Sequence, residues 1–236
     1  MSKKAVILSG GLGTRLRPFT EVIPKPLIPI GEKAVLEIQI EHFKKYGFKE
    51  IFLATNYKSD YIKNFFGDGS RYDVRLTISK ENKPLGTAGP IKLLADKLKD
   101  NAFIVMNGDI LSLVDFAKIY EFAMNRDSLM TIAIKEIVTP YEFGNIFFEG
   151  EDVTGIKEKP DLITYALAGI YVMKPSILDL IPEDQYFGMD SLIKLMLERK
   201  LKICKYELKE YWLDIGRVGD IEKAQEAYRE MFTAER

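Results

Sequence analysis

Short runs of apolar residues alternate along the first half of the chain with longer stretches in which apolar side chains recur every three or four positions. Continuous apolar runs predict buried strands at residues 5–8, 51–54 and 103–106. Between the first two runs a helical spacing holds up to Gly47, which is well placed to end a helix, and a second helix is predicted from Ser59 to a turn at Gly67. This order predicts an α/β fold, Rossmann-like, with a mixed, mostly parallel sheet covered by helices on both faces.

From about Leu129 the pattern changes to the alternation of apolar and polar residues that is typical of half-exposed strands. Strands are predicted at residues 130–135, 145–148, 153–156 and 168–172, and a terminal helix at residues 221–231. The second and third of these strands flank Glu149-Gly150-Glu151-Asp152 and predict an antiparallel hairpin. No linker or repeat divides the chain, so we expect one domain, residues 1–236, whose halves meet near residue 128 and whose second half carries a smaller antiparallel element.

Composition excludes several functional classes. With 47% hydrophobic and 29% charged residues, the chain has enough apolar material for a sizeable core. Its 34 Lys and Arg balance 35 Asp and Glu, which argues against broad contact with nucleic acid or a membrane surface. No apolar run is long enough for a signal-peptide core or a membrane-spanning helix. We therefore expect a cytoplasmic protein without nucleic-acid or membrane partners.

The single cysteine and the single histidine exclude further chemistry. Cys204 has no partner for an intrachain disulfide, and with His42 it falls short of the about four ligands that a structural zinc site needs. A lone cysteine suits a reducing compartment. Cys204 lies in an alternating, strand-like stretch and His42 beside a helical apolar face, so we expect both to pack rather than to react.

A glycine-rich turn, Ser9-Gly10-Gly11-Leu12-Gly13-Thr14-Arg15, directly follows the first predicted strand. Glycines allow the backbone to approach a phosphate and to donate its N–H groups. The turn is neither a dinucleotide fingerprint, because Leu16 stands where the third glycine is required, nor a Walker loop, because it ends in Gly13-Thr14-Arg15. Its continuation through Arg15-Leu16-Arg17-Pro18 to Pro24-Lys25-Pro26-Leu27 places fixed cations at both ends of a stiff segment, as a polyphosphate site would need.

This whole run resembles the signature of the sugar-1-phosphate nucleotidylyltransferases, also called nucleotide-sugar pyrophosphorylases. The resemblance implies that the run binds a nucleoside triphosphate, and that Arg15 and Lys25 act catalytically on the phosphates. Further along, Pro84-Leu85-Gly86-Thr87-Ala88-Gly89 is similar to the family segment that lies against the nucleobase. The nucleotide-binding residues implied in this way are Leu8, Gly10, Gly11, Gly13, Thr14, Arg15, Pro84, Leu85, Gly86, Thr87, Asn107 and Gly108.

Two carboxylates are candidate metal ligands. Asp109 follows Asn107-Gly108 at the end of an apolar strand, and Asp214, in Tyr211-Trp212-Leu213-Asp214-Ile215-Gly216, resembles the late family motif that supplies another ligand. Two carboxylates within ~4 Å would repel by about 4 kcal/mol at an effective dielectric near 20, so their convergence requires a cation or a shared proton. Mg²⁺ bound with a triphosphate meets that requirement. The alternatives are a helix cap or turn for Asp214 and core packing for Trp212.

The resemblance also implies a sugar site in the second half of the chain. Residues that are similar to the family's sugar and sugar-phosphate contacts are Lys25, Gly144, Glu158, Lys159, Ala168, Gly169 and Asp190. Leu167 departs from the pattern, because many members carry a polar residue there. Asp190 is explained equally well as the N-cap of a helix that contains Leu192 to Leu197.

The motifs look closest to the mannose-1-phosphate guanylyltransferase-like branch, which implies transfer of a nucleotidyl group from GTP to mannose, hexosamine or a related sugar 1-phosphate. Residues of about 1–128 would then bind the nucleotide and residues of about 129–236 the sugar. Thymidylyl or uridylyl transfer is the close alternative. From other classes, a silent nucleotide-sugar sensor or regulatory subunit and a glycosyltransferase remain; Asn107-Gly108-Asp109 in place of Asp-x-Asp disfavours the latter. A homo-oligomer is possible, and we expect it to use the surface of the core.

Overall fold

The computed structural model describes residues 2–56 and 58–232, and its centre is a seven-stranded sheet in the order β12-β8-β11-β6-β1-β4-β5. The parallel part comprises β1 (Lys4–Leu8), β4 (Glu50–Thr55), β5 (Arg75–Lys80) and β6 (Phe103–Asn107). The other three strands are β8 (Met130–Pro140), β11 (Asp161–Met173) and β12 (Ile203–Glu207). Strand β11 runs antiparallel to both β6 and β8, while β12 is parallel to β8. The predicted mixed, mostly parallel sheet is confirmed.

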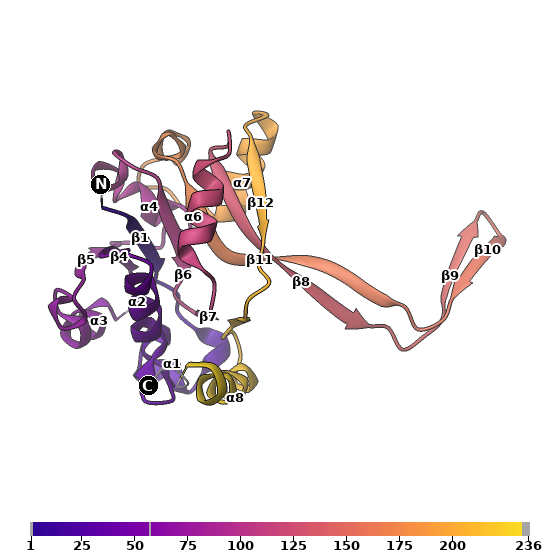
Figure 1. The fold of residues 1–236 in the computed structure, drawn as a ribbon, viewed down its shortest axis with the longest axis horizontal. Helices are drawn as coiled ribbons and strands as arrows, with labels where there is room; N and C mark the ends of the chain where they lie inside the picture. Colours follow the sequence, from indigo (N-terminus) through magenta and orange to yellow (C-terminus); the bar gives the residue numbers. More distant parts are fainter. Residues whose placement is uncertain (1, 57, 233–236) are drawn as a thin grey trace.

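Helices cover both faces of this sheet (Figure 1). One face packs against α2 (Val35–Lys45), α3 (Ser59–Phe66) and α6 (Phe116–Met124), and the other against α4 (Gly89–Lys92), α5 (Ala95–Leu98) and α7 (Met189–Glu198). Each face has its own hydrophobic core; we call the one beneath α2, α3 and α6 the first core and the one beneath α4, α5 and α7 the second core. Along β1, Ala5 and Ile7 point into the first core and Val6 into the second. The continuous apolar run in β1 is therefore the result of burial on both faces.

Local signals set the ends of the predicted helices. Helix α2 ends where Gly47 adopts a φ of +82° and its N–H donates to the carbonyl of Lys44, while the N–H of Phe48 donates to the carbonyl of Phe43. This pair of bonds satisfies carbonyls that the helix end would leave open. Helix α3 spans the residues expected from the sequence, Ser59–Phe66.

A third apolar cluster joins the two ends of the chain. It lies between the segment after the glycine-rich turn and the C-terminal helix α8 (Val218–Ala227), with Leu16, Ile215 and Tyr228 among its buried members. The shorter elements are α1 (Phe19–Val22), β2 (Pro29–Ile30), β3 (Lys33–Ala34), β7 (Ile110–Ser112), β13 (Trp212–Asp214), the 3₁₀ turns Thr14–Leu16, Lys25–Leu27, Ser70–Tyr72 and Pro175–Leu180, and a π-helical turn, Tyr228–Phe232. The third apolar cluster thus brings α8 and β13 close to the segment that follows the glycine-rich turn.

A long two-stranded ribbon leaves the body of the molecule (Figure 1). Strands β8 and β11 stay paired beyond the sheet, out to Pro140 and Asp161, and carry the hairpin β9 (Asn145–Glu149) and β10 (Asp152–Lys157) at the far end. The predicted hairpin is confirmed, but the strand expected at 168–172 starts seven residues earlier, at Asp161. We call residues 134–167 the arm.

The remaining expectations concern packing and membrane spans. His42 Nε2 lies 2.8 Å from the carbonyl of Val114, and its ring packs edge-on against Phe116, as expected for a packing residue. Cys204 lies within β12, and its thiol forms no disulfide. Among residues 2–56 and 58–232, no helix combines the length and the apolar character that crossing a bilayer requires.

Candidate active site

A cavity of about 520 Å³ lies at the carboxyl ends of β1, β4 and β6. In open α/β sheets this edge is where ligands bind. Of the predicted nucleotide-binding residues, those that line it are Leu8, Gly10, Gly11, Gly13, Thr14, Pro84, Leu85, Gly86, Thr87 and Asn107. Gly108 lies behind this wall, where its N–H donates to the carbonyl of Leu8 over 2.9 Å. Two motifs that are far apart in the sequence therefore form two walls of one cavity.

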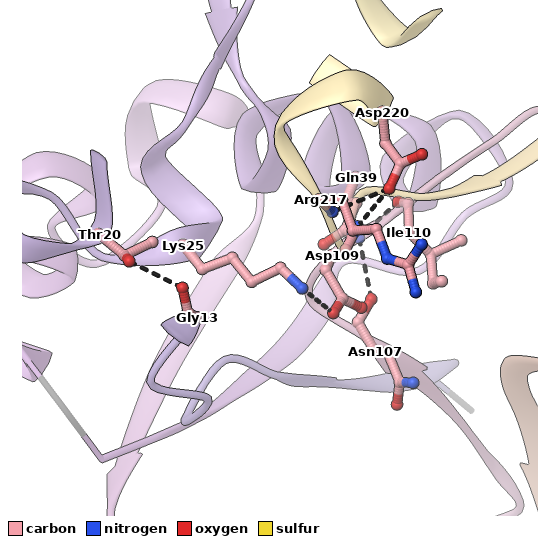
Figure 2. A network of polar contacts seen from close by, with 10 residues as sticks. Gly13, Thr20, Lys25, Gln39, Asn107, Asp109, Ile110, Arg217 and Asp220 are labelled. Atoms are coloured by element: carbon pink, nitrogen blue, oxygen red, sulfur yellow. Dashed lines mark hydrogen bonds and ion pairs between the residues drawn. The ribbon is translucent and has the colours of Figure 1, made fainter. Parts of the chain in front are cut away.

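The glycine-rich turn is held in a shape that only glycine permits at position 13. Gly13 has a φ of +61°, and a Cβ there would lie 2.7 Å from Cγ2 of Thr20. The hydroxyl of Thr20 donates to the carbonyl of Gly13 over 2.8 Å (Figure 2). This hydrogen bond holds the turn in place. Gly11 is exposed at the cavity, and a Cβ built on it would meet no atom within 4 Å.

The second wall is anchored to the segment that precedes α7. The N–H groups of Ala88 and Gly89 donate to the carbonyl of Phe187 over 2.9 and 3.0 Å. The hydroxyl of Thr87 accepts a hydrogen bond from the N–H of Met189 over 2.7 Å. A segment from the second half of the chain thus positions the loop that the resemblance assigns to the nucleobase.

The turn that carries Asp109 is clamped by a buried amide. Gln39, which is 2% exposed, donates from Nε2 to the carbonyls of Asn107 and Ile110, over 3.0 and 2.7 Å. Nζ of Lys25 forms an ion pair with Oδ2 of Asp109 (Figure 2). The side chains of Lys25 and Asp109 are only 12% and 25% exposed, so this pair is sheltered from water. The clamp and the ion pair together fix the position of the carboxylate.

Asp214 and Arg15 lie beside this carboxylate. Strand β13 pairs with β7, which places Asp214 opposite Ile110, and the N–H of Ile215 donates to the carbonyl of Asp109 over 2.9 Å. A Cβ built on Gly216 would lie 3.3 Å from Nη2 of Arg15 and 3.5 Å from Oδ1 of Asp214. Burial and, second, the charge of Asp109 raise the pKa of Asp214, while Lys25 and Arg15 oppose this shift. The structure thus brings the two predicted metal ligands and the two predicted catalytic cations together.

The helix-cap alternative for Asp214 is wrong. Helix α8 begins after Arg217, and the carboxylate of Asp220 accepts from the N–H groups of Gly216 and Arg217 over 3.2 and 2.8 Å. Asp214 is the last residue of β13 and takes no part in this cap. Its carboxylate therefore remains available for another role.

The donor set fits a magnesium ion that arrives with its substrate. Oδ1 of Asp109 is buried without a hydrogen-bond partner, whereas Oδ2 faces Lys25. Within the described residues, no group of three or more His, Cys, Asp or Glu could hold a metal ion. Mg²⁺ commonly takes one or two carboxylates and completes its shell with phosphate oxygens and water. Asp109 and Asp214 match this mode rather than that of an all-protein cage.

Two of the predicted sugar contacts border the same turn. Gly169 has a φ of +67°, and a Cβ there would lie 2.6 Å from Nδ2 of Asn107. The carbonyl of the buried Ala168 accepts a hydrogen bond from Nε1 of Trp212 over 2.8 Å. Trp212 also packs against the first core, which confirms the packing interpretation for that residue.

The other predicted sugar contacts do not reach the cavity in a single copy of the chain. Gly144, Glu158 and Lys159 lie on the arm, where a Cβ on Gly144 would be 3.0 Å from Oε2 of Glu158. Asp190 forms an exposed ion pair with Lys194 over 3.5 Å. The N-cap of α7 is Gly188, so the capping interpretation of Asp190 is wrong. A sugar-binding role for these four predicted contacts stays a prediction.

Sequence reasoning missed several residues of the site, chiefly Gln39 and Glu81. Glu81 lines the cavity, is 6% exposed and accepts a hydrogen bond from the N–H of Leu85 over 2.8 Å. Burial raises the pKa of Glu81, partly opposed by hydrogen bonds from Leu85 and Asn56. A signal existed for both residues, because Glu81 directly follows β5 and Gln39 lies three residues from Leu36 on an apolar helix face.

Known proteins are similar to this chain in sequence over most of its length. The family model described as nucleotidyl transferase matches residues 4–231. Mannose-1-phosphate guanylyltransferase 1 of Arabidopsis thaliana is 35% identical over 226 residues, covering 92% of this chain and 62% of the relative. Mannose-1-phosphate guanyltransferase of Yarrowia lipolytica is 34% identical over 224 residues, covering 92% and 61%. The chain thus spans about three-fifths of the length of these curated relatives.

Two solved structures have a similar fold. HddC from Yersinia pseudotuberculosis, complexed with GMP-PN, superposes with a TM-score of 0.74 at 29% identity and covers 96% of this chain and 99% of that chain. A Bacillus anthracis protein solved in complex with a sucrose reaches 0.80 at 24% identity, covers 98% and 96%, and shows the fold alone. Because the family model spans nearly the whole chain that builds this cavity, the protein belongs to the nucleotidyl transferase family.

Proposed function

We propose that the protein transfers a nucleotidyl group from a nucleoside triphosphate to a sugar 1-phosphate and releases pyrophosphate. The observation that carries the proposal is that Asp109, which lines the cavity walled by the glycine-rich turn, lies together with Lys25, Asp214 and Arg15. This grouping offers cations for phosphates and carboxylates for a metal. The relatives named mannose-1-phosphate guanylyltransferases support the same class of reaction.

The reaction would be a direct displacement at the α-phosphorus. A phosphate oxygen of the sugar 1-phosphate forms a bond to the α-phosphorus, the bond from that phosphorus to the bridging oxygen of the β-phosphate breaks, and pyrophosphate leaves with the electron pair. Such transfers depend mainly on positioning and on charge stabilisation. Backbone N–H groups of the glycine-rich turn and the guanidinium of Arg15 would hold the departing phosphates, while Lys25 and Lys159 would orient the attacking one.

Mg²⁺, held by Asp109 and Asp214, would neutralise charge on the phosphates when it is bound. In the absence of substrate, Lys25 neutralises Asp109 instead. Gln39 keeps the turn that carries Asp109 in place in both situations, because its two hydrogen bonds go to backbone carbonyls. The metal site is therefore prepared in advance while its charge remains compensated.

We favour GTP as the donor because of Glu81. Its carboxylate is an acceptor in the wall of the cavity. The Watson–Crick edge of guanine presents two adjacent donors, N1–H and the 2-amino group, whereas thymine and uracil present one donor between two carbonyls. In Glu81→Gln we expect the preference for GTP over ITP, which lacks the 2-amino group, to fall about tenfold, in line with the 1.5–3 kcal/mol of a charged hydrogen bond. An unchanged GTP/ITP ratio of kcat/KM would assign base selection to other groups.

The alternatives make different predictions. Thymidylyl or uridylyl transfer would appear as turnover with dTTP or UTP in place of GTP. A silent sensor is disfavoured because all four charged residues of the site are present, but it would bind nucleotide without turnover. A glycosyltransferase would instead consume a preformed nucleotide sugar and transfer the sugar to an acceptor.

The deciding experiment measures pyrophosphate release by the purified chain with Mg²⁺, each of four nucleoside triphosphates and a panel of sugar 1-phosphates. We expect release with GTP and a hexose or hexosamine 1-phosphate, dependent on both substrates. Binding of nucleotide without release for every pair would contradict the proposed reaction and support the sensor. We further propose that the protein works in the cytoplasm, because its one thiol is free and suits a reducing compartment.

A further inference from the structure

The arm exposes an unusual amount of apolar surface. Twelve of the 23 large apolar side chains that the described residues expose lie on its 34 residues, among them Phe143, Phe148 and Val153, each 68–69% exposed. Apart from Ile134, no arm residue belongs to a hydrophobic cluster of the described part of the chain. A two-stranded ribbon on its own is only marginally stable in water. In a single copy of the chain the apolar side chains of the arm are therefore left without a covering surface (Figure 1).

Strand register sorts this surface into faces. Val138 lies opposite Ile163 and Ile134 opposite Leu167, so these side chains share one face of the ribbon. In the hairpin, Ile146 lies opposite Ile156 and Phe148 opposite Val153, again on a common face. A continuous apolar face along a paired ribbon is a docking surface rather than a scatter of single residues.

The joint between ribbon and hairpin holds polar groups in a strained shape. Lys159 has a φ of +42° although it is not glycine, and Glu158 lies against Gly144. Such strain persists where surrounding structure enforces it, and it gathers at binding sites. The resemblance predicts Gly144, Glu158 and Lys159 as sugar or sugar-phosphate contacts, and the proposed function uses Lys159, yet none of them lines the cavity of its own chain.

The body of the molecule offers a complementary surface. Leu12 and Tyr186, which line the cavity, are 61% and 74% exposed, and Phe19 and Val22 are exposed on the short helix that follows the turn. The arm carries three Lys against seven Asp and Glu, whereas the rest of the chain carries 31 Lys and Arg against 28 Asp and Glu. An acidic, apolar arm and a basic body with an apolar cavity mouth attract each other. Since every copy has both parts, reciprocal exchange between two copies satisfies both arms and closes the assembly.

We propose that two copies of the chain exchange arms, so that the arm of each covers the cavity mouth of the other and brings Glu158 and Lys159 to its substrate. The active site is then completed by two chains. The catalytic part of this inference rests on the proposed function, whereas the exchange of arms does not.

Cross-linking tests the exchange without any activity. Two differently tagged chains carry Leu12→Cys and Lys159→Cys respectively, each with Cys204→Ser, and are mixed and treated with a short bis-maleimide. We expect a cross-linked product that contains both tags. The control pairs Leu197→Cys, an exposed apolar position on α7 outside the cavity, with Lys159→Cys and should give none. Equal yields from the two pairs, or no product from either, would overturn the exchange.

Sedimentation tests the apolar face. The wild-type chain should sediment as a dimer, and Phe148→Lys should shift it to a monomer with unchanged circular dichroism. Leu197→Lys, at a comparably exposed leucine of the body, should remain dimeric. A wild-type monomer at micromolar concentration, or a dimer that survives Phe148→Lys together with Ile156→Lys, would contradict the inference.

Complementation tests the shared site. Lys159→Ala damages the arm and Asp109→Asn the body, so co-assembled chains regain one intact site per mixed dimer, about a quarter of the wild-type activity in a statistical mixture. The control pair, Asp109→Asn with Asp214→Ala, has both defects in the body and should regain nothing. If the first pair also regains nothing while wild type is active, the site is built within one chain. If wild type turns over no substrate pair, the proposed function fails and the cross-link alone decides the exchange.

Discussion

The cavity and the arm differ in how completely the chain's own contacts determine them. Around the cavity, Asp109 is held by an ion pair and by a turn that Gln39 clamps, and Gly13 is held by Thr20. Along the arm, the backbone is paired, but apart from Ile134 no described side chain belongs to a hydrophobic cluster, and the contacts with the body are polar or cation–π contacts near its base, such as those of Lys135 and Tyr165. A site that must fix charge before substrate arrives needs redundant contacts. A surface whose contacts are made with a partner chain lacks such redundant contacts within its own chain.

The largest expected effect is on Asp109. Asp109→Asn removes a proposed metal ligand and the charged partner of Lys25, so we expect pyrophosphate release to fall about 10²- to 10³-fold, the usual cost of one charge-stabilising group. Asp96→Asn, at a side chain that is 95% exposed, is the control. Wild-type turnover in a folded Asp109→Asn protein would remove Asp109 from the metal site.

The buried clamp should matter nearly as much. Gln39→Met keeps the volume but removes two hydrogen bonds to the turn, which we expect to cost about 1–3 kcal/mol of unfolding free energy. Because the turn carries Asp109, kcat should fall more than KM for nucleotide, and more Mg²⁺ should be needed for half-maximal rate. A loss of stability with an unchanged Mg²⁺ requirement would mean that Gln39 only supports the fold.

Two glycines of the same turn provide a matched pair. Gly13→Ala meets a positive φ and a contact of 2.7 Å with Thr20, so it should lower the free energy of unfolding by about 1–2 kcal/mol in urea titrations. Gly11→Ala has open space around its Cβ and should change stability by less than about 0.5 kcal/mol. Equal losses would show that the turn is not rigid before nucleotide binds.

Glu81 should make stability fall as pH rises. Its pKa is raised above the ordinary 4.5 in the folded protein, so between the two pKa values the folded state holds more of this proton than the unfolded state. The contribution of Glu81 to stability is therefore highest below about 4.5 and declines until the pH passes the raised pKa. In Glu81→Gln, which keeps an acceptor for the N–H of Leu85, this decline should disappear from unfolding curves recorded across that range. If the free energy of unfolding depended on pH in the same way in both proteins, the raised pKa of Glu81 would be contradicted.

The smallest effect is expected on the arm. At concentrations where the chain is monomeric, Phe148→Ala should change the free energy of unfolding by less than about 0.5 kcal/mol, because its ring touches little in its own chain. Phe43→Ala, at a fully buried ring that stacks on Phe116, should cost about 3–5 kcal/mol. A large loss for Phe148→Ala under these conditions would show that the arm folds onto its own body.

Sequence alone determined the elements that depend on local physics. Strands buried on both faces are apolar throughout, and the positive φ of Gly47 marks the end of α2, so these boundaries could be predicted. Helix α3 begins at Ser59 as expected, but its N-cap is Lys58 and no side chain caps it, so capping preference does not explain this boundary. The walls of the cavity could also be predicted, because they are built from contiguous motifs at the ends of strands; their binding of nucleotide stays a proposal.

Only the tertiary structure decided what lies across from what. The pairing of β13 with β7 brings Asp214 to Asp109 over more than a hundred residues of chain, and Gln39 reaches the same turn from another helix. The backbone hydrogen bonds between Phe187 and the second wall likewise had no local signal. The sequence also did not predict the arm: alternation predicted strands at 130–135 and 168–172, whereas β8 continues to Pro140 and β11 begins at Asp161. Alternation alone does not determine whether such strands pack on their own body or extend from it.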